Sequence, residues 1–188
     1  AVIITGETAR KHNANTVLAS LSSMAGDFVV ATAGPDLESV LSAKGAGADA
    51  FSEEHRQAVA NIDIGGGTSN IALFQKGNLK GTSCLDIGGR LIKIENGRIS
   101  YIFPKIQKLA EAHGIHIAVG DRAEETVLYK ICEYMADQLA MAIHAREADS
   151  LHAGLYTNDG KPLTSEPKID AITYSGGVAS CYYNGEPA

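Results

Sequence analysis

The residues best suited to chemistry stand in the stretch NIDIGGGTSNIALF, residues 61–74, where three glycines separate two strand-like runs. A triple glycine loses much conformational entropy on folding, so a plain connection between strands explains it poorly. Bare glycine backbone can bring N–H groups close to a phosphate, because a Cβ atom there would block the approach. A carboxylate at the strand end can hold Mg²⁺, and a threonine adds a hydroxyl group. The candidate phosphate site therefore consists of Asp63, Gly65, Gly66, Gly67 and Thr68.

A second glycine turn occurs in ITYSGGVAS, residues 172–180, again after a strand-like run. Two such turns at the ends of strands in one sheet can flank a single ligand. Ser175, Gly176 and Gly177 therefore join the candidate site. The first stretch is neither a P-loop nor a dinucleotide fingerprint, since GxxxxGK[ST] and GxGxxG are absent and no helical pattern follows the three glycines. The alternative is a flexible strand connection that binds no ligand.

The composition narrows the class of protein. The chain has 188 residues, of which 45 % are hydrophobic, enough for a sizeable core, and its net charge is −6. No dense block of Lys and Arg occurs, which argues against nucleic acid or an anionic membrane as partner. No apolar run approaches the roughly 18 residues of a membrane span. The cysteines Cys84, Cys132 and Cys181 form no CxxC pair, as is typical of reduced thiols in a cytosolic protein, and we expect each to be a small buried hydrophobe.

The elements that position these turns follow an α/β pattern. Before the triple glycine we expect a strand at Val2–Thr5, a helix at Asn13–Met24, a strand at Phe28–Thr32, and a helix from Pro35 that buries Leu37, Val40 and Leu41. A short charged segment, Ser52 to Gln57, then leads into the strand that ends at Asp63.

After the triple glycine the pattern changes to a meander followed by helices. We expect strands at Asn70–Gln75 and Leu79–Leu85 around a Gly77-Asn78 turn, a hairpin at Arg90–Tyr101 around Asn96-Gly97, a helix at Pro104–His113, and a last strand at Ile169–Tyr174 that runs into a turn. The longest helix should start at a capping box formed by Asp121 and Glu124. Its buried stripe should contain Val127, Ile131, Met135, Leu139 and Ile143.

Two motifs resemble those of a known superfamily. DIGGGTSN is similar to the second phosphate motif of the actin and heat-shock chaperone ATPases, and YSGGVAS is similar to their adenosine motif. The resemblance implies ribonuclease H-like actin-type lobes: residues 1–58 would end the first lobe, and residues 59–188 would form most of the second, with a reduced upper subdomain at Arg90–Tyr101. It also implies that Asp63 positions Mg²⁺, that Gly65, Gly66, Gly67 and Thr68 hold the β- and γ-phosphates of ATP, and that Ser175, Gly176 and Gly177 pass close to the adenosine.

The sequence departs from the superfamily at three points. The first phosphate motif, Asp-x-Gly-Thr, does not occur and is expected upstream, so the chain is interpreted as an internal fragment that binds ATP poorly by itself. Gly34 and Asn70 stand where the chaperones carry glutamate and aspartate. The glycine in place of the glutamate argues against fast, chaperone-like hydrolysis, although ATPase activity is expected of the full-length protein.

Longer strings resemble one family within the superfamily. VIITGETARK, AGDFVVATAGPDLES, KGAGA and CLDIGGRLI are similar to the reactivating factors of ethanolamine ammonia-lyase. This resemblance implies a chaperone-like switch that uses ATP and Mg²⁺ to release damaged cobalamin from the lyase, its partner, with no nucleic acid or membrane involved. It implies a cytoplasmic protein, with association with a bacterial microcompartment as an option. Two alternatives stay open: an actin-like filament protein, which would pellet with ATP, and a hydantoinase-type ATP-dependent enzyme, which would turn over a cyclic amide.

Overall fold

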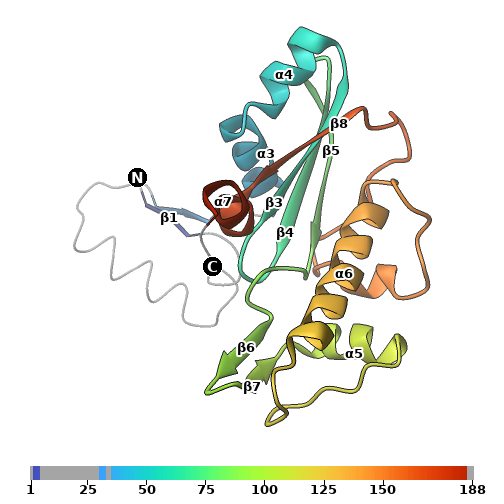
Figure 1. Ribbon diagram of the computed structural model, residues 1–188. Coiled ribbons are helices and arrows are strands. Elements are labelled where there is room, and N and C mark those ends of the chain that lie inside the picture. Colours follow the sequence, from blue (N-terminus) through green and yellow to red (C-terminus); the bar gives the residue numbers. More distant parts are fainter. Residues whose placement is uncertain (1, 5–29, 33–34, 186–188) are drawn as a thin grey trace.

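A four-stranded sheet with helices on both faces forms the centre of the described part of the chain (Figure 1). The structure is a computed structural model that describes residues 2–4, 30–32 and 35–185. In chain order the elements are β1 (Val2–Ile4), β2 (Val30–Thr32), α3 (Pro35–Gly45), α4 (Ala48–His55), β3 (Ala58–Ile64), β4 (Ser69–Gln75), β5 (Asn78–Leu85), β6 (Ile92–Glu95), β7 (Arg98–Ile102), α5 (Pro104–Ala112), α6 (Glu125–Ala142), the 3₁₀ helix η1 (His152–Leu155), β8 (Ala171–Ser175) and α7 (Gly176–Asn184).

The main sheet has the order β5-β4-β3-β8. Strands β3, β4 and β5 form the predicted antiparallel meander, and β8 pairs in parallel with β3. The parallel pairing joins segments that lie far apart in the sequence and brings both glycine turns to the same end of the sheet. The predicted hairpin at Asn96-Gly97 is also present, because both residues adopt the positive φ angles, 52° and 73°, that a two-residue turn requires.

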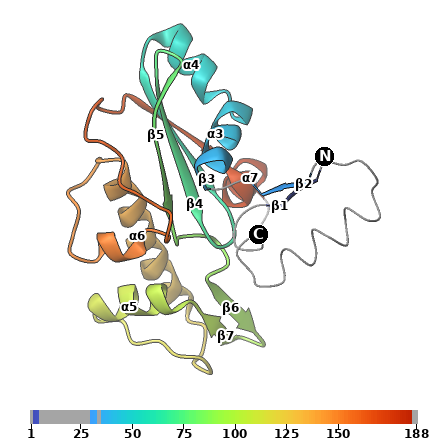
Figure 2. The same cartoon turned by 180° about the vertical axis from the view of Figure 1, so that it is seen from behind.

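Each face of the sheet packs against different helices (Figures 1 and 2). Ala60 and Ile62 of β3 point into the larger core, which also contains Ile106 of α5 and Ile131 of α6. Alternate residues point the other way, so Val59 packs in a smaller core against α3 and α4. The residues of this smaller core are Ala43, Ala48, Val59, Ala72 and Phe74. Asp63 has the same strand parity as Val59, which places it on the face of α3 and α4.

The helix α3 corrects one prediction. Leu37 and Leu41 are 50 % and 48 % exposed, whereas Ser39 and Ala43 are fully buried. Two small residues four positions apart form the face of α3 that packs against the sheet, and the leucines lie away from it. The pattern of large apolar residues therefore gave the wrong buried face, with only Val40 partly buried against the smaller core.

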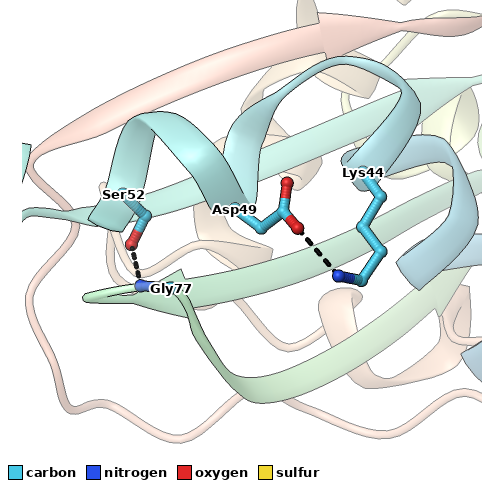
Figure 3. Close-up of polar contacts among 4 residues, drawn as sticks. All are labelled: Lys44, Asp49, Ser52 and Gly77. Atoms are coloured by element: carbon cyan, nitrogen blue, oxygen red, sulfur yellow. Dashed lines mark hydrogen bonds and ion pairs between the residues drawn. The ribbon is translucent and has the colours of Figure 1, made fainter. Parts of the chain in front are cut away.

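The charged segment before β3 is a second helix, α4, and not an irregular link. Figure 3 shows how it is fixed: the Lys44 ammonium group contacts Asp49 Oδ2 at 2.8 Å, and the buried Ser52 Oγ accepts a hydrogen bond from the Gly77 N–H at 3.3 Å. The hydrogen bond from Lys44 is the main cause that holds the pKa of Asp49 below its usual value. The contact from Ser52 links α4 to the turn between β4 and β5.

The longest helix confirms its predicted stripe but not its predicted start. Ile131, Leu139 and Ile143 are buried, and Val127 and Met135 pack partly buried against the same core. The helix α6 begins at Glu125 without a side-chain cap. The Asp121 carboxylate instead accepts a hydrogen bond from the Ala118 N–H at 2.8 Å, so it stabilises the preceding loop.

Three other expectations have different outcomes. Cys84 is buried as predicted, but Cys132 is exposed and Cys181 is half-buried, so the prediction of three buried thiols was wrong for two of them. The chain after β8 forms the helix α7 where only a turn was expected. Strands β1 and β2 pair in parallel, and the helix predicted at Asn13–Met24 lies outside the described residues.

In the part of the chain that the structure describes, no helix combines the length and apolar character needed to cross a membrane.

A buried polar network joins α6 to η1. Gln138 and His152 are 1 % and 5 % exposed. The Gln138 amide group donates to Asp149 Oδ2 at 2.7 Å, so its oxygen accepts from His152 Nδ1 at 2.9 Å, and His152 Nε2 accepts from the Tyr156 hydroxyl at 2.9 Å. Burial lowers the pKa of His152, and the Asp149 carboxylate offsets this only in part. Burial therefore favours the neutral form of His152.

Candidate functional site

The two predicted glycine turns lie side by side at one end of the sheet. Asp63 and Ser175 are register partners on the parallel strands β3 and β8, so the two strands end side by side. Gly176 has a φ of 87°, and a Cβ atom on it would lie 2.5 Å from the Ile64 carbonyl oxygen and overlap Asp63 Oδ1. Only glycine permits this close approach. We refer to this region, formed by residues 63–68, 88–90 and 175–177, as the mouth.

The buried side chain of Asn61 holds the two strands together below the mouth. Its Nδ2 group donates to Ser175 Oγ at 3.0 Å, and its Oδ1 atom accepts from Thr173 Oγ1 at 2.9 Å. Asn61 is fully buried, and each of these bonds spans from β3 to β8. The Ser175 oxygen is therefore occupied as an acceptor, and its hydroxyl position is fixed relative to Asp63.

A third glycine turn, which the sequence reasoning did not assign to the site, supports the first. The Gly89 N–H donates to the Gly65 carbonyl at 2.9 Å, and the Arg90 N–H donates to the Gly66 carbonyl at 2.7 Å. A Cβ atom on Gly88 would lie 2.6 Å from the Gly66 carbonyl group, so these backbones are in direct contact. The available signal was the Gly88-Gly89 pair directly after a strand, which repeats the arrangement of the other two turns.

Several polar groups of the mouth have no partner among the described residues. The N–H groups of Gly66, Gly67 and Thr68 donate to no acceptor there, whereas the Gly65 N–H closes the turn onto the Thr68 carbonyl at 3.0 Å. Within the same described part of the chain, the Asp63 carboxylate makes no hydrogen bond or ion pair. Asn70 Oδ1, directly across the sheet from Asp63, is buried without a partner.

These groups fit a magnesium–phosphate ligand. Backbone N–H groups that converge in a glycine turn bind anions, and a single carboxylate at its edge suits Mg²⁺, which keeps several waters and binds phosphate oxygens at the same time. Across residues 2–4, 30–32 and 35–185, no three His, Cys, Asp or Glu side chains gather into a metal site of their own. A metal held here would therefore depend on ligands from the phosphates as well as from Asp63.

Two cavities lie away from the mouth. One, of about 620 Å³, runs beside β8 and is lined by residues that include His144, Lys168 and Tyr174. The other, of about 210 Å³, lies between α5 and η1 and is lined by Lys105 and Leu155 among others. Neither cavity is lined by a mouth residue.

The sheet order and the flanking helices define an α/β protein with a ribonuclease H-like fold, as predicted. Among solved structures, the PPX-GPPA enzyme of Aquifex aeolicus matches 97 % of this chain and 46 % of its own length, with a TM-score of 0.51 at 18 % identity. A second structure of the Aquifex aeolicus Ppx/GppA family member matches 99 % of this chain and 46 % of its own, with a TM-score of 0.50. At such low identity these matches establish the fold alone.

The chain belongs to the family of the ethanolamine utilisation protein EutA, which matches residues 1–188. It is 41 % identical over 189 residues to the ethanolamine ammonia-lyase reactivase EutA of Salmonella typhimurium. It is 40 % identical over 186 residues to the reactivase of the same name from Escherichia coli. The alignments cover 100 % and 97 % of this chain but 40 % and 38 % of those relatives, so the chain spans about two fifths of their length. The predicted family is confirmed.

Proposed function

We propose that the mouth is one side of a Mg-ATP site in a protein that reactivates ethanolamine ammonia-lyase. The observation that carries this proposal is the register of β3 with β8, which brings Asp63, whose carboxylate has no partner among the described residues, to the level of Ser175. Unpaired N–H groups on the neighbouring glycine turn then face a region that already contains a potential metal ligand. A purely structural strand connection has no need for this combination.

Each predicted residue has a definite role in the proposed site. Asp63 positions Mg²⁺, directly or through water, and the ion, when bound, neutralises phosphate charge. The β- and γ-phosphates accept hydrogen bonds from the turn formed by residues 65–68. Ser175, Gly176 and Gly177 lie at the start of α7, where absent side chains let the backbone pass close to the adenosine. Residues 1–58 and 59–188 would belong to the two lobes that close on the nucleotide.

The client enzyme is proposed from the relatives. Both curated relatives are named as reactivases of ethanolamine ammonia-lyase, and this chain is about two fifths identical to each. We infer a chaperone-like cycle in which the protein binds the lyase differently in its two nucleotide states and so releases damaged cobalamin. The states must differ in affinity for the lyase by several kcal/mol to displace a tightly held cofactor.

Calorimetry on the full-length protein tests the nucleotide site. Asp63→Asn keeps the size of the side chain but removes the charge that would hold the metal. We expect it to weaken binding of Mg-ATP at least tenfold, or about 1.4 kcal/mol. Glu54→Gln removes one exposed charge from α4 and serves as the matched control. Equal affinities in the wild type and in both variants would remove Asp63 from the site.

A reactivation assay tests the client. Lyase inactivated by a cobalamin that lacks its adenosyl group should recover activity with the full-length protein, ATP, Mg²⁺ and fresh adenosylcobalamin. The lyase should co-purify with the protein in one nucleotide state and not in the other. Equal co-purification with ATP, with ADP and without nucleotide would contradict the switch. ATP-dependent pelleting without recovery of lyase activity would favour the filament alternative.

A further inference from the structure

The arginine that follows the third glycine turn lies directly over the triple glycine. Its N–H donates to the Gly66 carbonyl at 2.7 Å, which fixes the Arg90 backbone against the turn. Its Cδ, Cγ and Cβ atoms lie 3.4, 3.6 and 3.7 Å from the position that a Cβ atom of Gly66 would occupy. The aliphatic stem of Arg90 therefore packs across the middle glycine of the mouth.

The guanidinium group at the end of this stem has no counter-ion among the described residues. Arg90 is exposed and takes part in none of the ion pairs or side-chain hydrogen bonds found there. Arg56 and Arg122 likewise have no side-chain partner in that part of the chain, whereas Arg98 donates to the Gly120 carbonyl at 2.7 Å and Arg146 contacts Asp137 at 2.7 Å. What sets Arg90 apart is its position, because its stem lies on the triple glycine.

The hydrogen-bond donors next to Arg90 indicate that its charge serves to bind an anion. The unpaired N–H groups of Gly66, Gly67 and Thr68 belong to the turn that its stem crosses, so donors of the main chain and of the guanidinium group are gathered at one place. A guanidinium group offers a planar fork of donors that matches two phosphate oxygens. Main-chain N–H groups and a guanidinium group can both donate to the oxygens of one anion, such as a phosphate.

We propose that Arg90 binds the phosphate chain of the nucleotide held at the mouth. The inference rests on the proposed function, because it names a further residue of the same site. The Gly88-Gly89 pair serves this role by letting the backbone come close enough for the Arg90 stem to lie on Gly66. The absence of a side chain at Gly66 in turn leaves room for that stem and for the ligand.

The test compares Mg-ATP binding by the full-length wild type and its variants in calorimetry. Arg90→Met keeps the stem and removes the guanidinium group, and we expect a ten- to hundredfold weaker affinity, the usual effect of losing a charge-assisted contact. Arg90→Lys keeps the charge without the fork and should restore part of the loss. The affinity of Arg90→Met should also depend less on salt concentration. Lys80→Met, at the opposite end of β5, removes an equal charge from an exposed position and should bind like the wild type.

The melting temperature of the nucleotide-free protein separates binding from structure. It should be unchanged in Arg90→Met, since the packed stem remains. An affinity within twofold of the wild type, or a loss that comes with a lower melting temperature, would overturn the assignment of Arg90. Such a result would leave the proposed ATP site standing, whereas a wild type that fails to bind Mg-ATP would overturn both.

Discussion

The mouth and the network around His152 are two polar regions that differ in how far their groups are hydrogen-bonded. In the network, the side chains of Gln138, Asp149 and Tyr156 satisfy His152 and one another within hydrogen-bond distance. In the mouth, the Asp63 carboxylate has no partner among the described residues, and beside it the buried Asn70 Oδ1 atom has none there either.

The contrast separates polar groups that hold the fold from polar groups that await a ligand. An unpaired buried polar group costs free energy, so it persists where something else compensates for it. The network stabilises the protein by itself, whereas under the proposed function the unpaired groups of the mouth serve binding. Substitutions of polar side chains in the two regions should therefore change different measured quantities, while the close-packed glycine backbone of the mouth should affect stability. The following predictions run from the largest expected effect to the smallest.

The close contact between the glycine turns should be the most sensitive point. Gly176→Ala would combine a positive φ with overlap against the Ile64 carbonyl and Asp63, and we expect it to lower the free energy of unfolding by about 3 kcal/mol. Gly177→Ala is the matched control, because a Cβ atom there meets nothing within 4 Å. Urea unfolding followed by circular dichroism measures both. Equal stabilities of the two variants would contradict the packing of Gly176 against β3.

Breaking the network should have the next largest effect on stability. Gln138→Leu keeps a similar volume but removes the partner of Asp149 Oδ2 and of His152 Nδ1, which should lower the free energy of unfolding by about 2 kcal/mol. Affinity for Mg-ATP should stay unchanged in calorimetry, because the network lies outside the mouth. If the variant lost nucleotide affinity but no stability, the division between the two regions would be wrong.

The network should also make stability depend on pH. Burial holds the pKa of His152 below its usual value, and His144 lowers it further, against the opposing effect of Asp149. As the pH falls below about 6.5, His152 binds a proton in the unfolded chain but not yet in the folded protein. Protonation therefore favours the unfolded state, and the free energy of unfolding falls. We expect a flatter profile below about pH 7 in His152→Gln, because the substituted side chain does not titrate. Parallel profiles for the two proteins would exclude His152 as the source.

The smallest expected effect on stability is that of Asp63→Asn, although this substitution should weaken the binding of Mg-ATP. Asp63→Asn removes no interaction among the described residues, so the free energy of unfolding should change by less than about 0.5 kcal/mol. Thermal unfolding without nucleotide measures it. A loss comparable to that of Gln138→Leu would show that Asp63 supports the fold and would weaken its assignment as a metal ligand.

The sequence predicted most local features of the fold. Strand-like runs on both sides of a turn signal predicted the meander, the Asn96-Gly97 pair predicted the hairpin, and the four-residue spacing after Val127 predicted the buried stripe of α6. Prediction from the sequence failed where contacts with distant segments of the chain determine which residues are buried. The face of α3 that packs on the sheet carries Ser39 and Ala43, whose small side chains give no hydrophobic signal.

The sequence predicted which residues form the candidate site but not the contacts that hold them together. Both glycine motifs could be identified from their spacing after strands, and the structure brings them together at Asp63 and Ser175. The support from Gly88 and the position of Arg90 could not be predicted, because they depend on the contact between the β5–β6 connection and the triple glycine.

The bonds made by Asn61 have a consequence for the order of assembly on the ribosome. Its partners Thr173 and Ser175 follow it by 112 and 114 residues. The meander of β3, β4 and β5 needs only neighbouring segments and can form while the rest of the chain is still being made, whereas β8 must wait for its own synthesis. Until then one edge of β3 is unpaired and the Asn61 amide has neither of its partners. A nascent chain that stops before residue 171 would therefore carry the triple glycine without a mouth, and the site would be completed late in translation.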